Sequence, residues 1–275
     1  MSLLFCSFSS GSSGNCYLVK TEKTAVLIDA GISASRIRNG LFRTDTSEES
    51  VKALFLTHEH HDHITGARVL LKKLAKTKVY ASFGTMEGTI RHDRNQKLSF
   101  EKEINEDRRI GIDPDAPISI DDMKISAFGT MHDSKEPFGY LVMSGKKSIA
   151  IITDTGYVTE EMIYNIADAD VLVLEANHDM ELLRSGSYPH YLKQRILSDH
   201  GHLSNNQTAD VLLRVLEYRK KKRVVLLAHL SGENNTPAIA ERTVLSALAR
   251  EGHYTGSDLY MGVLHRDEAS LLYRL

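Results

Sequence analysis

Short apolar runs and segments of helical spacing alternate along the whole chain. An apolar run of about four to eight residues is typical of a buried strand, whereas apolar positions three and four apart are typical of a helix packed on a sheet. The predicted strands are residues 3–8, 15–20, 24–29, 51–57, 78–81, 123–128, 148–152, 171–175, 224–228, 259–263 and 269–273. The predicted helices are residues 34–41, 66–75, 207–217 and 238–250, the third capped from Ser204 or Asn205. This alternation predicts an α/β fold in which helices cover two sheets.

The chain of 275 residues is expected to form one domain, residues 1–275. Its length would also allow two average domains, but large α/β sandwiches commonly reach this size as one. No Pro-rich or Ser-rich linker separates two halves, and the chain has neither internal repeats nor low-complexity segments.

Four residues that can bind metal lie within six positions, directly after the apolar part of the predicted strand 51–57. They are His58, His60, Asp62 and His63, in the pattern His-x-His-x-Asp-His. In extended backbone His58 and His60 project from the same side, whereas His63 breaks that alternation. One short loop can therefore serve two neighbouring metals, the first two residues binding one and the last two the other. Imidazole and carboxylate suit zinc, manganese or iron, and two cysteines are too few for a four-cysteine zinc site.

Further ligands are expected at the ends of other strands, because each metal needs roughly four to six. Three residues have that setting: His132, Asp154 and His229 each follow a predicted strand. Asp154 is the natural shared ligand, since a carboxylate can bridge two metals with its two oxygens. An ordinary polar residue at a strand end would explain any one of them alone, but their combination with the cluster favours a metal centre.

Four further motifs accompany the metal-binding cluster. They are S-G-S-S-G-N-C at 10–16, L-I-D-A-G at 27–31, E-A-N-H at 175–178 and G-H-L-S-N at 201–205. Together with the cluster and the later ligands, they resemble the metallo-β-lactamase superfamily over nearly the whole chain. Within it, the chain most closely resembles the WalJ group of bacterial cytoplasmic nucleases, also called YycJ or VicX.

The resemblance implies a four-layer αβ/βα sandwich with two metals at one edge of two facing sheets. It implies His58, His60 and His132 at site one, Asp62, His63 and His229 at site two, and Asp154 as the bridge. His60 stands where the redox-active flavodiiron branch usually carries glutamate. The interval from Asp154 to His229 is too short for the inserted domain of the β-CASP nucleases, so the small single-domain form is expected.

Two residues are candidates for catalytic steps around the metals. Two divalent ions can lower the pKa of a bridging water, and Asp62 is expected to orient the resulting hydroxide. His202 is the candidate that protonates the leaving oxygen, with a histidine that packs or caps the loop as an equal alternative. Asp29 and Glu175 are expected to orient metal ligands instead of taking part in catalysis.

Other polar residues near these motifs receive no catalytic role. His178 is a weaker candidate that follows a predicted strand, and His190 and His200 lie in the polar stretch 184–202 without an assignment. No histidine–carboxylate relay is recognisable around Ser134, and a metal hydroxide removes the need for one. Serine catalysis is therefore rejected.

The net charge of −2 gives no overall attraction to nucleic acid, so basic contacts to phosphate would have to be local. Four lysines fall between residues 72 and 78. Arg91, Arg94 and Lys97 lie in a poorly periodic segment that either borders the metal cleft or is a solvated loop. The basic run 219–223 is interpreted as a helix C-terminus, where cations complement the helix dipole.

The chain is expected to be a cytoplasmic protein. Its N-terminus does not resemble a secretory signal, and no run approaches the roughly 18 apolar residues needed to span a membrane. Cys6 and Cys16 can face each other across a hairpin, but two reduced, buried thiols are expected because no export signal is present.

Three functions fit these observations. The leading one is a dinuclear-metal nuclease, by resemblance a 5′-to-3′ exonuclease on double-stranded DNA. The second is a hydrolase of lactones, thioesters or cyclic phosphodiesters, with a narrow pocket and no dependence on the basic segments. The third is a non-catalytic DNA-binding or regulatory module, which the ligand set disfavours because structural zinc sites are usually closed and mononuclear. The oligomeric state stays open.

Overall fold

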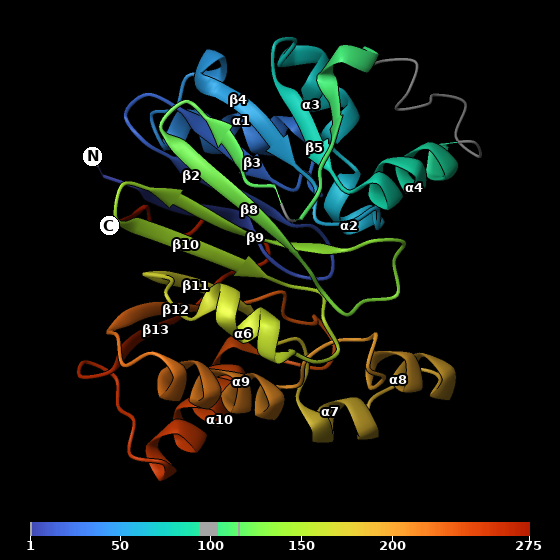
Figure 1. Ribbon diagram of the computed structural model, residues 1–275. Helices are drawn as coiled ribbons and strands as arrows, with labels where there is room; N and C mark the ends of the chain where they lie inside the picture. Colours follow the sequence, from blue (N-terminus) through green and yellow to red (C-terminus); the bar gives the residue numbers. More distant parts are fainter. Residues whose placement is uncertain (1, 94–103, 115) are drawn as a thin grey trace.

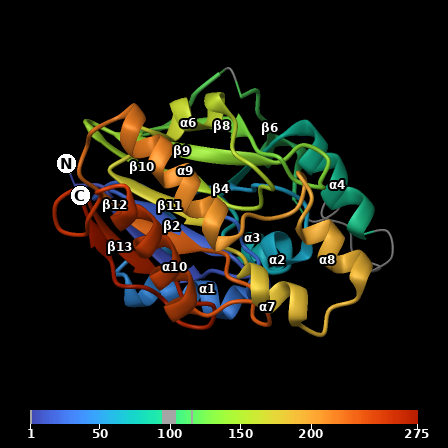
Figure 2. The same cartoon turned by 90° about the horizontal axis from the view of Figure 1, so that it is seen from below.

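The computed structural model of the chain describes residues 2–93, 104–114 and 116–275. Its described strands form two facing sheets, and helices lie on the outer side of each sheet (Figure 1). The order is β14-β1-β2-β3-β4-β5-β6 in the first sheet and β13-β12-β11-β10-β9-β8-β7 in the second. Figure 2 shows that the chain termini lie at one end of the molecule, and α2, α7 and α8 lie towards the other end.

The elements have the following bounds. The first sheet contains β1 (Leu4–Ser9), β2 (Cys16–Lys20), β3 (Ala25–Ile28), β4 (Val51–Phe55), β5 (Lys78–Ala81), β6 (Arg109–Gly111) and β14 (Tyr273–Arg274). The second contains β7 (Ile118–Ile120), β8 (Met123–Gly129), β9 (Phe138–Ser144), β10 (Lys147–Ile152), β11 (Val171–Glu175), β12 (Arg223–Ala228) and β13 (Leu259–Val263). The helices are α1 (Ala34–Arg43), α2 (His61–Ile64), α3 (Ala67–Lys73), α4 (Phe83–Asp93), α6 (Glu160–Ile166), α7 (Met180–Ser185), α8 (His190–Ile196), α9 (Asn205–Tyr218) and α10 (Pro237–Arg250).

Alternate side chains of the inner strands enter different cores, because successive residues of a strand point to opposite faces. In β4, Phe55 packs in the core between the two sheets, whereas Leu54 packs in the core beneath α1 and α3. In β11, Val173 packs between the sheets, whereas Leu174 packs in the core formed with α9. Both faces of each sheet are therefore covered, which confirms the expected four-layer αβ/βα sandwich.

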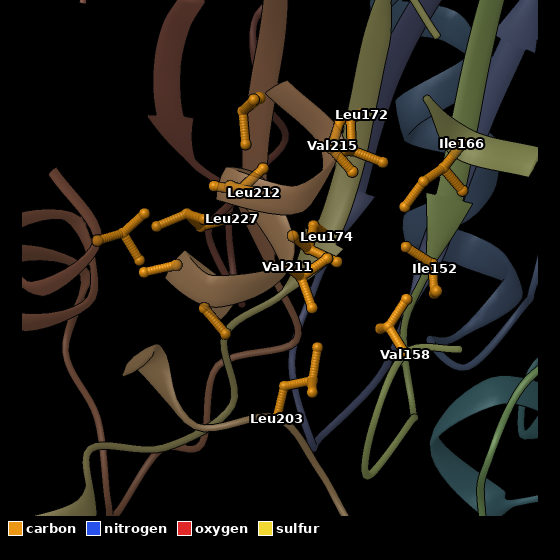
Figure 3. Close-up of a cluster of buried hydrophobic side chains, with 14 of the residues drawn as sticks. Ile152, Val158, Ile166, Leu172, Leu174, Leu203, Val211, Leu212, Val215 and Leu227 are labelled. Carbon is orange, nitrogen blue, oxygen red and sulfur yellow. The ribbon is translucent and has the colours of Figure 1, made fainter. Parts of the chain in front are cut away.

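The outer face of the second sheet supports the helix that follows the G-H-L-S-N motif. Ser204, one of the two predicted caps, caps α9, and it forms a capping box with Gln207 at the start of the helix. Val211, Leu212 and Val215 of α9 point into the same apolar layer as Leu174 of β11 (Figure 3). This packing fixes the position of the loop that immediately precedes α9.

The carboxyl ends of the parallel strands meet at one edge of the sandwich. β3, β4 and β5 are parallel to one another in the first sheet, and β10, β11 and β12 are parallel in the second. The loops after three of these strands contain Asp29 (φ 60°), Asp154 (φ 57°) and His229 (φ 55°), all left-handed. Non-glycine residues in this region are strained, and such strain concentrates at functional sites. This edge is therefore where a functional site is expected.

Most predicted elements are confirmed within a few residues, but the strand predicted at 269–273 is wrong over most of its length. Only Tyr273–Arg274 pair as β14. The Ser270 hydroxyl accepts a hydrogen bond from the Ser7 N–H at 2.9 Å, so that donor is not available to a backbone carbonyl of a continued ladder. The structure adds α6, α7 and α8, each of seven residues or fewer, which are too short to show a helical period in the sequence.

Two smaller predictions concern the cysteines and the basic run 219–223. Cys6 and Cys16 are buried and form no disulfide, as expected. The basic run follows the C-terminus of α9, also as expected. Within it, the buried Arg223 donates hydrogen bonds to the carbonyl oxygens of Ala167 (2.7 Å) and Arg219 (2.8 Å), so its guanidinium ties two helix ends together. No helix in the described part of the chain is long and apolar enough to cross a membrane.

Candidate metal centre

The candidate ligands converge at the carboxyl edge of the two sheets. The sequence cluster follows β4 and runs into α2, and the three later residues follow β8, β10 and β12. They form two groups, and the ligand atoms within each group all lie within 4.8 Å of one another. The first group is His58, His60 and His132, and the second is Asp62, His63, Asp154 and His229. This is the division of residues expected above; their role as metal ligands stays a prediction.

In the first group, three imidazoles face a common point. His60 Nδ1 lies 3.2 Å from His132 Nε2. His58 Nδ1 lies 3.0 Å from the Thr57 hydroxyl, and its Nε2 is buried without a hydrogen-bond partner among the described residues. His132 Nδ1 donates to the Gly201 carbonyl oxygen at 3.0 Å, which directs Nε2 towards the group.

In the second group, each imidazole lies against at least one carboxylate. His63 Nε2 lies 3.2 Å from Asp154 Oδ2 and 3.5 Å from Asp62 Oδ2. His229 Nε2 lies 3.3 Å from the same Asp62 oxygen. The far side of the His63 ring is fixed, because its Nδ1 lies 2.7 Å from Asp29 Oδ2. Asp29 therefore orients a candidate ligand, as expected for it.

Asp154 lies between the two groups. Its Oδ1 is 3.2 Å from His229 Nδ1 of the second group and 3.8 Å from His132 Nε2 of the first, and its Oδ2 is 3.2 Å from His63 Nε2 of the second. Oδ2 is buried and has no hydrogen-bond partner in the described residues. A carboxylate in this position can contribute one oxygen to each group.

The donors present fit divalent ions. Buried polar atoms are nearly always hydrogen-bonded, so the unpartnered Nε2 of His58 fits a nitrogen that binds an ion. Imidazole nitrogens with carboxylate oxygens are the donors typical of zinc, manganese and iron sites.

Glu175 connects the second group to His202. Its Oε1 lies 2.8 Å from His202 Nδ1 and 2.9 Å from His229 Nδ1, and its Oε2 accepts from the Thr155 and Leu203 backbone N–H groups. Burial alone would raise the pKa of Glu175, but the two histidines outweigh it, His202 most strongly, and lower that pKa to about 2. The residue is therefore a carboxylate at neutral pH, and it holds both imidazoles in place.

The two groups differ in protonation when no metal is bound. In the second group burial disfavours imidazolium, but the nearby carboxylates, Asp154 first, outweigh it and raise the pKa of His63 well above its usual range. For His229 too, the nearby carboxylates, Asp154 first, outweigh burial and raise the pKa to about 10. In the first group burial prevails and lowers the pKa of His132 to about 4. The second group thus holds protons at neutral pH, whereas the first is neutral.

Two motifs near the N-terminus hold the loops that carry these residues. The Asn15 N–H donates to the Asp62 carbonyl oxygen at 2.8 Å, and the Ser10 hydroxyl accepts from the His229 N–H at 2.9 Å. A Cβ on Gly31 would lie 1.6 Å from that Asp62 carbonyl oxygen, so only glycine fits there. The S-G-S-S-G-N-C and L-I-D-A-G motifs therefore act by positioning.

The remaining sequence candidates lie outside both groups. His178 is fully buried, burial lowers its pKa to about 4, and neither ring nitrogen has a partner in the part of the chain described. His190 and His200 are exposed. Arg94 and Lys97 lie outside the described residues, as does the side chain of Arg91.

Two contacts at the site were not among the sequence predictions. The Thr57 hydroxyl lies 2.9 Å from Asp29 Oδ2 and 3.1 Å from His63 Nδ1. Arg195 of α8 forms a bidentate ion pair with Asp133, the residue that follows His132. Thr57 could have been suspected from its place before the cluster, but the Arg195 contact joins residues 62 positions apart in a way that no local pattern shows.

Comparison with known proteins decides the family. Residues 24–230 match the family described as the beta-lactamase superfamily domain. The chain belongs to the β-lactamase superfamily. Within this superfamily, the exodeoxyribonuclease WalJ of Streptococcus pneumoniae is 39% identical over 260 residues, covering 93% of this chain and 89% of WalJ. The exodeoxyribonuclease YycJ of Bacillus anthracis is 34% identical over 261 residues, covering 93% of each chain. The likeness to the WalJ group read from the motifs is thereby confirmed.

A solved structure of the superfamily supports the fold. The metallo-beta-lactamase fold protein YhfI from Bacillus subtilis superposes with a TM-score of 0.70, covering 99% of this chain and 100% of that chain. The identity is 15%, so this likeness concerns the architecture of the β-lactamase superfamily alone.

Proposed function

We propose that this chain is a metal-dependent nuclease, acting as a 5′-to-3′ exonuclease on double-stranded DNA. The observation that carries the proposal is the pair of histidine–aspartate groups that meet at Asp154, in a chain whose relatives WalJ and YycJ are named exodeoxyribonucleases. The metals are two divalent ions, zinc or manganese, and iron suits the same donors. The compartment is the cytoplasm, where a bacterial cell keeps its DNA.

Two ions would be held by the two groups of residues. His58, His60 and His132 would hold the first, Asp62, His63 and His229 the second, and Asp154 both. When bound, such a pair of ions neutralises charge on the phosphodiester and lowers the pKa of a water molecule.

The chain itself prepares three imidazoles for this role. Each ring has a partner on Nδ1 that directs its Nε2 towards the proposed metal: Asp29 for His63, Glu175 for His229 and the Gly201 carbonyl for His132.

Asp62 has the position expected of a residue that orients the attacking water. Its side chain is 24% exposed, whereas that of Asp154 is 3% exposed. Its Oδ2 faces His63 and His229, and Oδ1 has no protein partner among the described residues. That oxygen is therefore free to accept a hydrogen bond from water at the mouth of the site.

His202 protonates the leaving oxygen. Its Nδ1 donates to Glu175, so the proton to be delivered is the one on Nε2. The buried Glu175 carboxylate fixes the orientation of the ring, and the ring, 17% exposed, can reach a bound substrate. Positioned proton donors of this kind contribute about 10²- to 10⁴-fold in rate.

The cluster itself supplies a matched pair of variants to test the proposal. His60 belongs to the first group, whereas the adjacent His61 is exposed and belongs to neither. His60→Ala should lose metal-dependent DNA hydrolysis and bound metal, while His61→Ala should keep both. Full DNA hydrolysis by His60→Ala would refute the assignment.

A further inference from the structure

The outward face of α8 exposes an aromatic ring and a guanidinium one helical turn apart. Tyr191 is 72% exposed, and the side chain of Arg195 is 50% exposed. Residues four apart lie on the same face of a helix, with Cα atoms roughly 6 Å apart along the axis. Ile196, the next residue of α8, is buried and holds the helix against the protein. A tyrosine this exposed forms no part of the described core, and its ring is available to a ligand.

This face is attached to the metal centre through Arg195. Its Nε and Nη2 donate to the two oxygens of Asp133, the latter at 3.0 Å, and Asp133 directly follows His132. Nη1 has no protein partner among the described residues. The guanidinium therefore lies at the rim of the first ligand group, with one side open to solvent.

The segment after α8 packs directly on the loops of the site. The Gly201 carbonyl accepts from His132, and a Cβ on Gly156, two residues after Asp154, would lie 2.3 Å from the Asp199 carbonyl oxygen. Figures 1 and 2 both place α8 at the same end of the molecule as α2, which carries Asp62 and His63. The outward face of α8 thus borders the mouth of the site.

The segment that contains α8 carries positively charged side chains, which favours the binding of a polyanion. Residues 184–198 include Arg184, Lys193 and Arg195 and no acidic residue, although Asp199 follows the segment and the whole chain is slightly acidic. Lys193 donates to two backbone carbonyls of the segment and Arg195 pairs with Asp133, so a phosphate would be met by the open side of the Arg195 guanidinium. An aromatic ring beside a cation is the combination by which proteins hold single-stranded nucleic acid, through base stacking and phosphate contacts.

We propose that α8 binds the DNA strand being cut, with Arg195 on a backbone phosphate and Tyr191 stacked on an unpaired base. The inference rests on the proposed nuclease function and deepens it. A base inside a duplex is stacked on both faces, so Tyr191 can take only a base at the end of the duplex, and in this proposal the enzyme takes the terminal nucleotides in unpaired form. A small phosphodiester reaches the metal centre without these contacts, so α8 sets the preference for a polynucleotide.

The first test compares two substrates on the metal-loaded enzyme. For Tyr191→Ala, the ratio of kcat/KM on a DNA oligonucleotide to kcat/KM on bis(p-nitrophenyl) phosphate should fall about tenfold, through KM for DNA. Tyr254→Ala is the matched control. Tyr254 is 57% exposed and precedes β13, which is parallel to β12, so it lies at the amino ends of these strands, whereas His229 follows the carboxyl end of β12. An unchanged ratio in Tyr191→Ala, or an equal fall in both variants, would overturn the inference.

The second test asks whether Arg195 contacts a phosphate. Binding of a cleavage-resistant phosphorothioate single strand is measured by fluorescence anisotropy over a range of salt concentrations, with metal content checked in each variant. Losing one phosphate contact should reduce the slope of log K against log salt concentration by about 0.7 in Arg195→Gln, while Arg195→Lys keeps the slope. An unchanged slope in Arg195→Gln would show that the residue only holds Asp133.

These measurements distinguish failure of the proposed nuclease function from failure of the proposed role of α8. If the wild-type enzyme hydrolyses the small diester but neither binds nor cleaves DNA, the nuclease function fails and the role of α8 fails with it. If the wild-type enzyme cleaves DNA and both variants behave like it, only the role of α8 is refuted.

Discussion

Metal binding at the second ligand group should depend steeply on pH, because protons must leave before metal enters. Without metal, His63 and His229 are held as imidazolium at neutral pH by the carboxylates around them. The pKa of His229 is about 10, against an ordinary value near 6.5, and that of His63 lies well above its usual range. A metal ligand must be a neutral imidazole, so binding releases both protons.

The magnitude follows from this count. Each released proton makes the apparent association constant rise about tenfold per pH unit, so two give about 100-fold per unit. The slope should persist from about pH 7 to 9 and flatten as the pH approaches the pKa of His229. The first group should show almost no such dependence over this range, since burial already keeps its histidines neutral, with the pKa of His132 at about 4.

Titration calorimetry of the metal-stripped protein provides the assay. Titrations at pH 7.5 in two buffers of different ionisation enthalpy give the number of protons released per metal. One ion should release about two protons and the other about none. A release below one proton for both ions, or an affinity that is flat between pH 7 and 9, would refute the electrostatic description of the site.

Three further predictions follow from particular contacts. Asp29→Asn removes the carboxylate on His63 Nδ1 and should weaken metal affinity about 10- to 100-fold in a chelator competition assay, whereas Asp45→Asn, at an exposed turn, should not. His202→Gln should lower DNA hydrolysis about 10²- to 10⁴-fold but spare bis(p-nitrophenyl) phosphate, whose leaving group needs no proton. Gly31→Ala should displace the Asp62 loop, and metal analysis should show loss of the second ion.

Each of these has a contradicting result. Wild-type metal affinity in Asp29→Asn would mean that His63 needs no orienting partner. An equal loss on both substrates in His202→Gln would assign the residue to site structure and not to proton transfer. Two bound ions in Gly31→Ala would show that the loop adapts to the added Cβ.

The ligand groups could be predicted because each member stands at the end of an apolar run. β10 and β12 are buried on both faces and read as near-continuous aliphatic sequence, so the single polar residue that follows each one is conspicuous. Parallel strands then bring residues distant in sequence to one edge. This is why Asp154 and His229 were foreseeable partners of the cluster, although His229 lies 167 residues after Asp62.

Contacts made through loops could not be predicted in this way. The Arg195–Asp133 pair and the Gly201 carbonyl on His132 depend on how the segment between β11 and α9 folds back over the site. α7 and α8 have seven residues or fewer, which is less than the length at which a helical period emerges. The error at 269–273 has a related cause, since the Ser270 side chain replaces a backbone group in the edge ladder.

The central claim is tested most directly by degradation of an end-labelled DNA duplex. Metal-stripped protein is incubated with duplex labelled at the 3′ end of one strand, and manganese or zinc is added back. Progressive shortening from the 5′ end, absent with chelator and absent in Asp154→Ala, is the result the proposed function predicts. No cleavage with any metal despite two bound ions, or undiminished cleavage by Asp154→Ala, would contradict it.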